Sequence, residues 1–178
     1  MRWLLNVLKA LGVLVLPLVL VAYLLPERRS VKRSRDIALP AVQIWPYVVE
    51  PKRWQAWSPW IERDPAMTQR FSGPASGVGA QWSWDSSTQG QGSLRFERVE
   101  APRLLAYTLR LEDVGTTAQG EIWLTPLGET STRVEWSFDV RLGVNPLMRW
   151  FGLGLDAMVG RDFDAGLARL ATVAAASR

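Results

Sequence analysis

The apolar residues follow three different patterns along the chain, and the first pattern predicts a membrane helix. Residues 10–25 carry no charge, and the apolar stretch extends back to Trp3 with only Asn6 and Lys9 as interruptions. At a rise of about 1.5 Å per residue, roughly 20 apolar residues cross the hydrocarbon core of a bilayer. Residues 1–26 are therefore predicted to form a transmembrane anchor.

Two other interpretations of this N-terminal stretch stay open. A cleaved signal peptide needs small residues at its cleavage site, whereas this stretch runs into Tyr23, Pro26 and Glu27. A buried or interfacial helix would rarely be apolar on every side for four turns. An uncleaved anchor is the favoured interpretation.

The basic residues after the stretch bear on its orientation. Residues 27–36 form a basic juxtamembrane segment with five cations, against two cations and the α-amino group before the stretch. By the positive-inside rule this favours a single-pass protein whose C-terminal domain lies on the cytoplasmic side, with only a small margin over the periplasmic side.

The second pattern is alternation, which predicts strands. Two short helices are expected at 41–49 and 51–57, within a series of segments in which every second residue is apolar. Short strands at regular spacing with turn residues between them indicate an antiparallel meander. Strands are expected at 30–39, 68–72, 80–85, 93–100, 105–111, 120–125 and 132–142.

The third pattern begins at Pro146, where apolar residues recur at steps of three and four. This predicts one amphipathic helix of about 28 residues, interrupted by glycines that suit a kink or a close approach to the sheet. Residues 37–178 are therefore expected to form one α+β domain of the helix-grip type, in which a curved antiparallel sheet and two short helices hold a long C-terminal helix.

Composition removes several kinds of chemistry. The chain has no cysteine and no histidine, which excludes disulfides, Ser-His-Asp triads and His/Cys zinc sites. We expect no metal and no cofactor. The net charge of +4 comes from the residues around the N-terminal stretch, because residues 37–178 carry 14 basic and 15 acidic side chains. Nucleic-acid binding is therefore not expected.

Three segments of the sequence resemble the SRPBCC superfamily, which includes START-like lipid-transfer domains and polyketide cyclase/dehydrase-like proteins. They are the tryptophan-rich stretch 39–60, the glycine turn 73–79 and the terminal stretch 145–170. The likeness covers roughly residues 30–175 and is greatest to bacterial members with an N-terminal membrane helix. It implies a hydrophobic ligand cavity between the sheet and the long helix. No catalytic motif of the superfamily matches, so no catalytic residue is assigned.

Aromatic residues are the candidates for lining such a cavity. Ten tryptophans is unusually many for 178 residues, and three of them follow one another at three-residue steps from Trp54. They could admit a flat or greasy ligand, or could simply cover the end of the sheet. Trp123 and Trp136 are expected in the core. The candidate cavity residues are Trp57, Trp60, Trp82, Trp84 and Tyr107.

Polar candidates are few. Asp64, which precedes a proline, is expected to be a turn residue, and Asp162 and Asp164 are expected on the solvated face of the long helix. The expected function is membrane-anchored binding or presentation of a hydrophobic small molecule or lipid. Two alternatives remain: a cyclase- or dehydratase-like enzyme acting on a polyketide-like substrate, and a protein-interaction module whose cavity is filled. Without a recognisable catalytic constellation, a non-enzymatic role is favoured.

Overall fold

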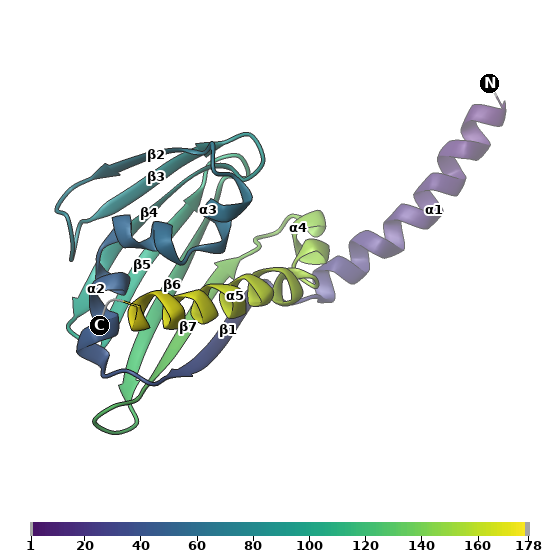
Figure 1. Cartoon of the computed structure of the whole chain (residues 1–178). Helices are drawn as coiled ribbons and strands as arrows, with labels where there is room; N and C mark the ends of the chain where they lie inside the picture. The colour runs from purple at the N-terminus through teal and green to yellow at the C-terminus, as the bar shows by residue number, and fades with distance from the viewer. Residues whose placement is uncertain (1, 177–178) are drawn as a thin grey trace.

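The alternating segments form a single antiparallel sheet in a computed structural model, which describes residues 2–176 and, within the first helix, the side chains of residues 3, 6 and 13–24. The sheet has seven strands in the order β1-β7-β6-β5-β4-β3-β2, so β2 to β7 form the predicted meander and β1 joins it beside β7 (Figure 1). The strands are β1 (Arg28–Ile37), β2 (Thr68–Ser72), β3 (Gln81–Ser86), β4 (Gly90–Glu100), β5 (Leu104–Leu111), β6 (Thr116–Pro126) and β7 (Thr132–Arg141).

Alternation along the strands separates an apolar inner face from a polar outer face. In β7, Val134, Trp136 and Phe138 are buried, while Arg133 just before them and Asp139 just after them are exposed. Apolar burial contributes roughly 25 cal/mol per Å², so the face with the large apolar side chains turns toward the helix that covers it. The predicted α+β fold with a curved antiparallel sheet is confirmed.

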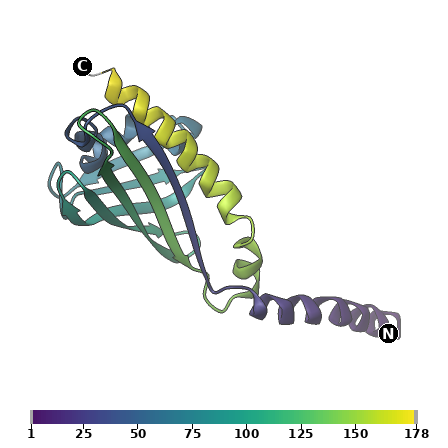
Figure 2. The same ribbon diagram turned by 90° about the horizontal axis from the view of Figure 1, so that it is seen from below.

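The expected long C-terminal helix is confirmed, but its predicted start at Pro146 was wrong. The segment from Pro146 forms two helices, α4 (Pro146–Phe151) and α5 (Leu155–Ala175). Between them, the Leu153 amide donates to the Trp150 carbonyl and the Gly154 amide donates to the Phe151 carbonyl, each three residues back and 3.1 Å away. These tighter turns break the helix where its glycines lie. Helix α5 then runs along the inner face of the sheet (Figure 2).

A glycine brings α5 close to the edge strand β1. A side chain at Gly160 would overlap the guanidinium group of Arg33, which lies on the inner face of β1. The same guanidinium is 3.0 Å from the Asp156 carboxylate and 3.3 Å from that of Asp164, one on each side of Gly160 along α5. The sequence-based expectation that glycines in this helix permit close approach is confirmed here.

Three short elements cover one side of the inner face: α2 (Ala41–Val49), the 3₁₀ helix η1 (Pro51–Ala56) and α3 (Pro59–Arg63). The sequence predicted only two. Two buried tryptophans join η1 and the residue after it to α2, because Trp54 Nε1 donates to the Val48 carbonyl at 2.9 Å and Trp57 Nε1 donates to the Tyr47 carbonyl at 3.0 Å.

The N-terminal helix α1 (Arg2–Leu24) projects from the domain at the point where β1 begins (Figures 1 and 2). No helix whose side chains the structure describes is both long and apolar enough to cross a membrane. The predicted transmembrane helix over 1–26 is therefore not confirmed. Side chains 1, 2, 4, 5 and 7–12 of that segment lie outside the described residues.

A buried arginine joins α1 to the domain. Arg149 of α4 donates from Nη1 to the carbonyls of Tyr23 and Leu25, each at 3.2 Å, and from Nε to the Gly143 carbonyl at 3.0 Å. A cation is favourable at a helix C-terminus, where the last carbonyls lack partners within the helix. Trp150 adds a bond from Nε1 to the Leu18 carbonyl at 3.1 Å. The exit direction of α1 is thus set by α4.

Candidate functional site

A cavity of about 250 Å³ lies between the inner face of the sheet and the N-terminal half of α5. Strands β3, β4, β5 and β7 supply one wall, and η1, α3, α4 and α5 supply the other. Nearly all of its lining side chains are apolar or aromatic. They are Trp54, Trp60, Met67, Trp82, Trp84, Gln89, Leu94, Tyr107, Leu109, Leu111, Phe138, Phe151, Leu155, Met158, Val159 and Phe163.

The structure brings four of the five candidate residues together at this cavity: Trp60, Trp82, Trp84 and Tyr107. Trp57 is not among the lining residues. Its side chain is fully buried against Trp136, with ring centroids 5.1 Å apart, and it belongs to the core instead. Three-residue spacing could not separate Trp57 from Trp60, because the chain turns between η1 and α3 and sends the two rings to different places.

Two glycines make room for aromatic rings on the cavity floor, each lying on the strand next to that of its ring. Gly92 lies directly opposite Trp84, and Gly120 lies directly opposite Tyr107. A side chain at either glycine would overlap the facing ring. The rings therefore lie flat across the neighbouring strand rather than standing into the cavity, which keeps its volume open.

Tyr107 supplies one of the few polar atoms in the cavity wall. Its hydroxyl accepts a hydrogen bond from Trp136 Nε1 at 2.7 Å. Burial raises the pKa of the Tyr107 hydroxyl well above its usual value, although the bond from Trp136 opposes that shift. The hydroxyl therefore stays protonated at neutral pH.

Trp60 is positioned by Asp162, a buried acid that was expected from the sequence to be exposed to solvent. Asp162 of α5 is only 8% exposed and accepts from Trp60 Nε1 at 3.2 Å and from Arg63 Nη1 at 3.0 Å. Arg63 Nη2 makes a second contact with the same carboxylate. The expectation of a solvated Asp162 was wrong, because α3 folds over this face of α5. Asp164 is exposed, as expected.

Several wall residues were not selected from the sequence. Phe151, Met158 and Val159 come from α4 and α5, and all three lie on or beside the apolar stripe that predicted the helix. Phe151 and Met158 are 49% and 46% exposed although they line the cavity, so its mouth lies at the α4 end of α5. The stripe was the available signal, but it does not distinguish residues that fill the core from residues that face a void.

The wall of the cavity is almost entirely apolar. Among its residues only Gln89, Tyr107 and the indole N–H groups are polar, and none is a carboxylate or a cation. Asp64, the other acid considered, forms the expected turn: its Oδ1 accepts from the Ala66 amide at 3.1 Å and its Oδ2 from Ser86 Oγ at 2.6 Å. No group of three or more acidic side chains that could hold a metal ion occurs within the described part of the chain.

Comparison with known families agrees with this geometry. The family model for polyketide cyclase / dehydrase and lipid transport matches residues 28–175, which is most of the chain. The chain belongs to this family. The match begins at β1 and ends with α5, so it covers the whole sheet and the cavity. The SRPBCC resemblance is thereby confirmed. No curated protein gave a sequence match.

Solved structures of the same fold are similar at low sequence identity. Norcoclaurine synthase from Thalictrum flavum, in complex with dopamine and hydroxybenzaldehyde, superposes with a TM-score of 0.65 at 15% identity, covering 85% of this chain and 88% of that chain. A Thermobifida fusca protein gives 0.63 at 21% identity, with coverage of 82% and 92%. A Chromobacterium violaceum protein gives 0.59 at 14% identity, with coverage of 82% and 96%. At these identities the likeness concerns the fold.

Proposed function

We propose that the domain binds a hydrophobic small molecule or lipid in the cavity between the sheet and α5. The observation that carries this proposal is the cavity itself, which combines about 250 Å³ of space with a wall of apolar and aromatic side chains. Small-molecule sites are concave, mostly apolar and furnished with few polar groups. Because the cavity opens at Phe151 and Met158, water would contact its apolar wall if no ligand were bound, and transferring that apolar surface from water to a hydrophobic ligand is favourable.

The lining favours binding over acid–base catalysis. General acid–base chemistry needs a titratable group within reach of the reacting atom, with a pKa near the working pH. Tyr107 is held neutral by burial, and the carboxylate of Asp162, which bonds the lining residue Trp60, is also bonded to Arg63 on the α3 side. The amide of Gln89 and the indole groups can orient a ligand but are poor proton carriers.

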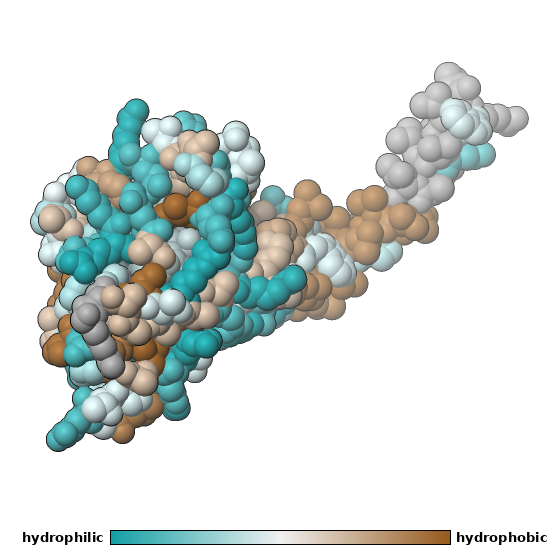
Figure 3. All heavy atoms as spheres, in the orientation of Figure 1, coloured by the Kyte–Doolittle hydropathy of each residue, from teal (hydrophilic) through white to brown (hydrophobic). Residues whose placement is uncertain are grey.

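We further propose that α1 attaches the domain to a membrane, on the cytoplasmic side, where it presents the ligand. Apolar side chains of α1 are exposed on several sides and appear as a brown stretch beside the domain in Figure 3. The exposed side chains include Val13, Leu14, Leu16, Leu18, Leu20 and Leu24. Tethering would raise the effective concentration of the domain at a bilayer, where hydrophobic ligands collect.

The cavity is tested by ligand binding to the full-length chain in lipid nanodiscs. A fluorescent polyene fatty acid should bind saturably above a protein-free nanodisc blank, with a Kd in the micromolar range, about −8 kcal/mol. Trp84→Leu should weaken binding about tenfold, because leucine keeps the wall apolar but removes the ring contact.

The matched control is Trp123→Leu. The expected core position of Trp123 was wrong: it lies on the outer face of β6, where its Nε1 donates to Glu121 at 2.7 Å, so its loss should leave binding unchanged. Circular dichroism verifies that each variant keeps its fold. Equal affinities for all three proteins, or no saturable binding across lipids, isoprenoids and aromatics, would contradict the proposal.

A further inference from the structure

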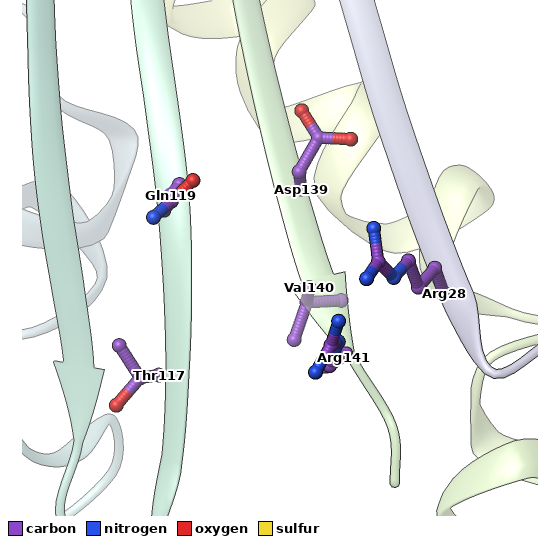
Figure 4. Close-up of a pocket in the computed structure, with 6 residues that line it drawn as sticks. All are labelled: Arg28, Thr117, Gln119, Asp139, Val140 and Arg141. Carbon is purple, nitrogen blue, oxygen red and sulfur yellow. The ribbon is translucent and has the colours of Figure 1, made fainter.

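A shallow groove of about 470 Å³ lies on the outer face of the sheet, opposite the side covered by α5. It is found where β1 begins and β7 ends, next to the point at which α1 leaves the domain (Figure 4). It shares no lining residue with the ligand cavity. Its wall is polar and basic, and is formed by Arg28, Thr117, Gln119, Asp139, Val140 and Arg141.

Two arginines face each other across this groove. Arg28 of β1 and Arg141 of β7 are direct cross-strand partners, and Arg28 extends toward β7 beside Arg141 (Figure 4). Directly opposed residues have Cβ atoms about 4.5–5.5 Å apart, and like charges in that position are destabilising. Among the side chains that the structure describes, none forms a hydrogen bond or ion pair with either guanidinium. With Asp139 included, the groove carries one net positive charge.

The other charged pairs on these two strands are arranged differently. At the far end, Asp36 lies opposite Arg133, and the carboxylate accepts from Nε at 2.7 Å and from Nη2 at 2.8 Å. Between the two ends, Lys32 Nζ is 2.6 Å from Glu135 Oε1. Among the residue pairs that β1 and β7 place directly opposite each other, only the pair at the α1 end consists of two cations. These two arginines could be neutralised by an anion from outside the chain.

We propose that Arg28 and Arg141 bind the phosphate group of an anionic phospholipid headgroup. A guanidinium group offers planar, forked N–H donors that match phosphate oxygens, and two of them at one site provide both charge and geometry. The Thr117 hydroxyl and the Gln119 amide add further donors along the groove.

The surroundings identify a lipid as the source of that phosphate. Arg28 follows four residues after Leu24, the end of α1, whose side chain is 85% exposed. Leu147 of α4 and Leu153, just after it, are 75% and 51% exposed at the same end of the domain. Exposed apolar groups beside cationic ones are characteristic of surfaces that bind anionic bilayers.

This site deepens the proposed function and rests on it. The cavity mouth at Phe151 and Met158 belongs to the same α4 end of the domain. Binding a headgroup with Arg28 and Arg141 would hold that mouth against the bilayer surface. A hydrophobic ligand could then move between bilayer and cavity with little exposure to water.

The test is native mass spectrometry of the full-length chain released from micelles that contain equal amounts of phosphatidylglycerol and phosphatidylcholine. The wild-type chain should retain phosphatidylglycerol in preference to phosphatidylcholine. The double variant Arg28→Gln/Arg141→Gln should retain at least about tenfold less phosphatidylglycerol than the wild-type chain, since each basic side chain near a surface strengthens anionic-lipid binding several-fold. Asp139→Asn should retain more, because it removes the opposing charge from the groove.

The matched control is Arg95→Gln/Arg110→Gln. These two exposed arginines line a second groove on the same outer face. Replacing both lowers the net charge by the same amount as Arg28→Gln/Arg141→Gln. Retention equal to wild type in this control supports the site, whereas a loss equal to that of Arg28→Gln/Arg141→Gln would mean general charge attraction and overturn it.

Two further outcomes would also overturn the proposal: no preference for phosphatidylglycerol, and displacement of the lipid by inorganic phosphate at equal concentration, which would indicate a site for free phosphate. The fatty-acid titration of the cavity should be the same in Arg28→Gln/Arg141→Gln as in wild type. Loss of the headgroup site and failure of cavity binding are therefore distinguishable.

Discussion

The space between the sheet and α5 has two halves that are both lined by tryptophans. One half is filled by side chains, and the other contains the open cavity. In the half beneath η1, Trp54, Trp57 and Trp136 are all fully buried and in edge-to-face contact or close tilted contact with one another. In the half toward α4, Trp82 and Trp84 face α5 across an open cavity.

The difference lies in what opposes each ring. Trp136 is stacked on Phe163 of α5 with ring centroids 4.0 Å apart, and Trp54 and Trp57 each donate an indole N–H to a backbone carbonyl of α2. Trp82 Nε1 is buried, but no partner for it occurs among the described residues. In the filled half each ring thus meets a packing surface and its indole N–H meets an acceptor, which α2 supplies for Trp54 and Trp57 and Tyr107 supplies for Trp136.

The largest effect is expected from emptying the filled half. Trp136→Ala should lower the free energy of unfolding by about 3–5 kcal/mol, because it removes a fully buried ring and leaves a void among aromatic neighbours. Trp123→Ala, on the outer face of the neighbouring strand, should cost about 1 kcal/mol or less. Urea unfolding of the full-length chain followed by far-ultraviolet circular dichroism measures both. Similar losses of unfolding free energy in Trp136→Ala and Trp123→Ala would contradict a special contribution of the filled half to stability.

A smaller effect is expected from disturbing the cavity floor. At Gly92 an added methyl group would overlap Trp84 and would lie 2.8 Å from the Arg110 carbonyl, so both a ring and a backbone strand must shift. Gly92→Ala should cost about 1–3 kcal/mol and weaken fatty-acid binding.

Gly154→Ala is the control for this change. An added methyl group there would meet only the Phe151 carbonyl, at 3.8 Å, and the backbone φ is −87°. Its stability should equal that of wild type or exceed it slightly, since alanine limits the unfolded chain more than glycine does. Unchanged ligand affinity in Gly92→Ala would show that the position of the Trp84 ring does not shape the site.

The smallest effect concerns the ion pairs that hold α5 to β1. The hydrogen bond from Arg33 lowers the pKa of Asp156 in the folded chain below its usual value. The stabilisation is therefore present above the unfolded pKa of about 4 and is lost as the pH falls toward the folded pKa. Arg33→Gln should be slightly less stable than wild type at neutral pH, and the difference should shrink at acid pH. Thermal unfolding across this range measures it, and a difference that grows with acidity would contradict the assignment.

Much of the architecture could be predicted from local patterns. Alternation predicted the meander, and three- and four-residue steps predicted a helix along the sheet, because side-chain periodicity is a local property of each element. The site was predicted only in part. Trp60 and Trp57 follow the same spacing, yet one lines the cavity and the other fills the core. Asp162 looked solvated because nothing in its own helix indicates that Arg63 and Trp60 cover it.

What the sequence by itself determined is therefore the set of elements, the faces they bury and the absence of cysteine and histidine chemistry. Only the tertiary structure decided where the inner face is filled and where it stays open, and that Arg28 would lie opposite Arg141. The physical reason is that a cavity and a cross-strand pair depend on the register and distance between segments far apart in sequence. Burial periodicity specifies which face a residue occupies, but not which residue it will meet there.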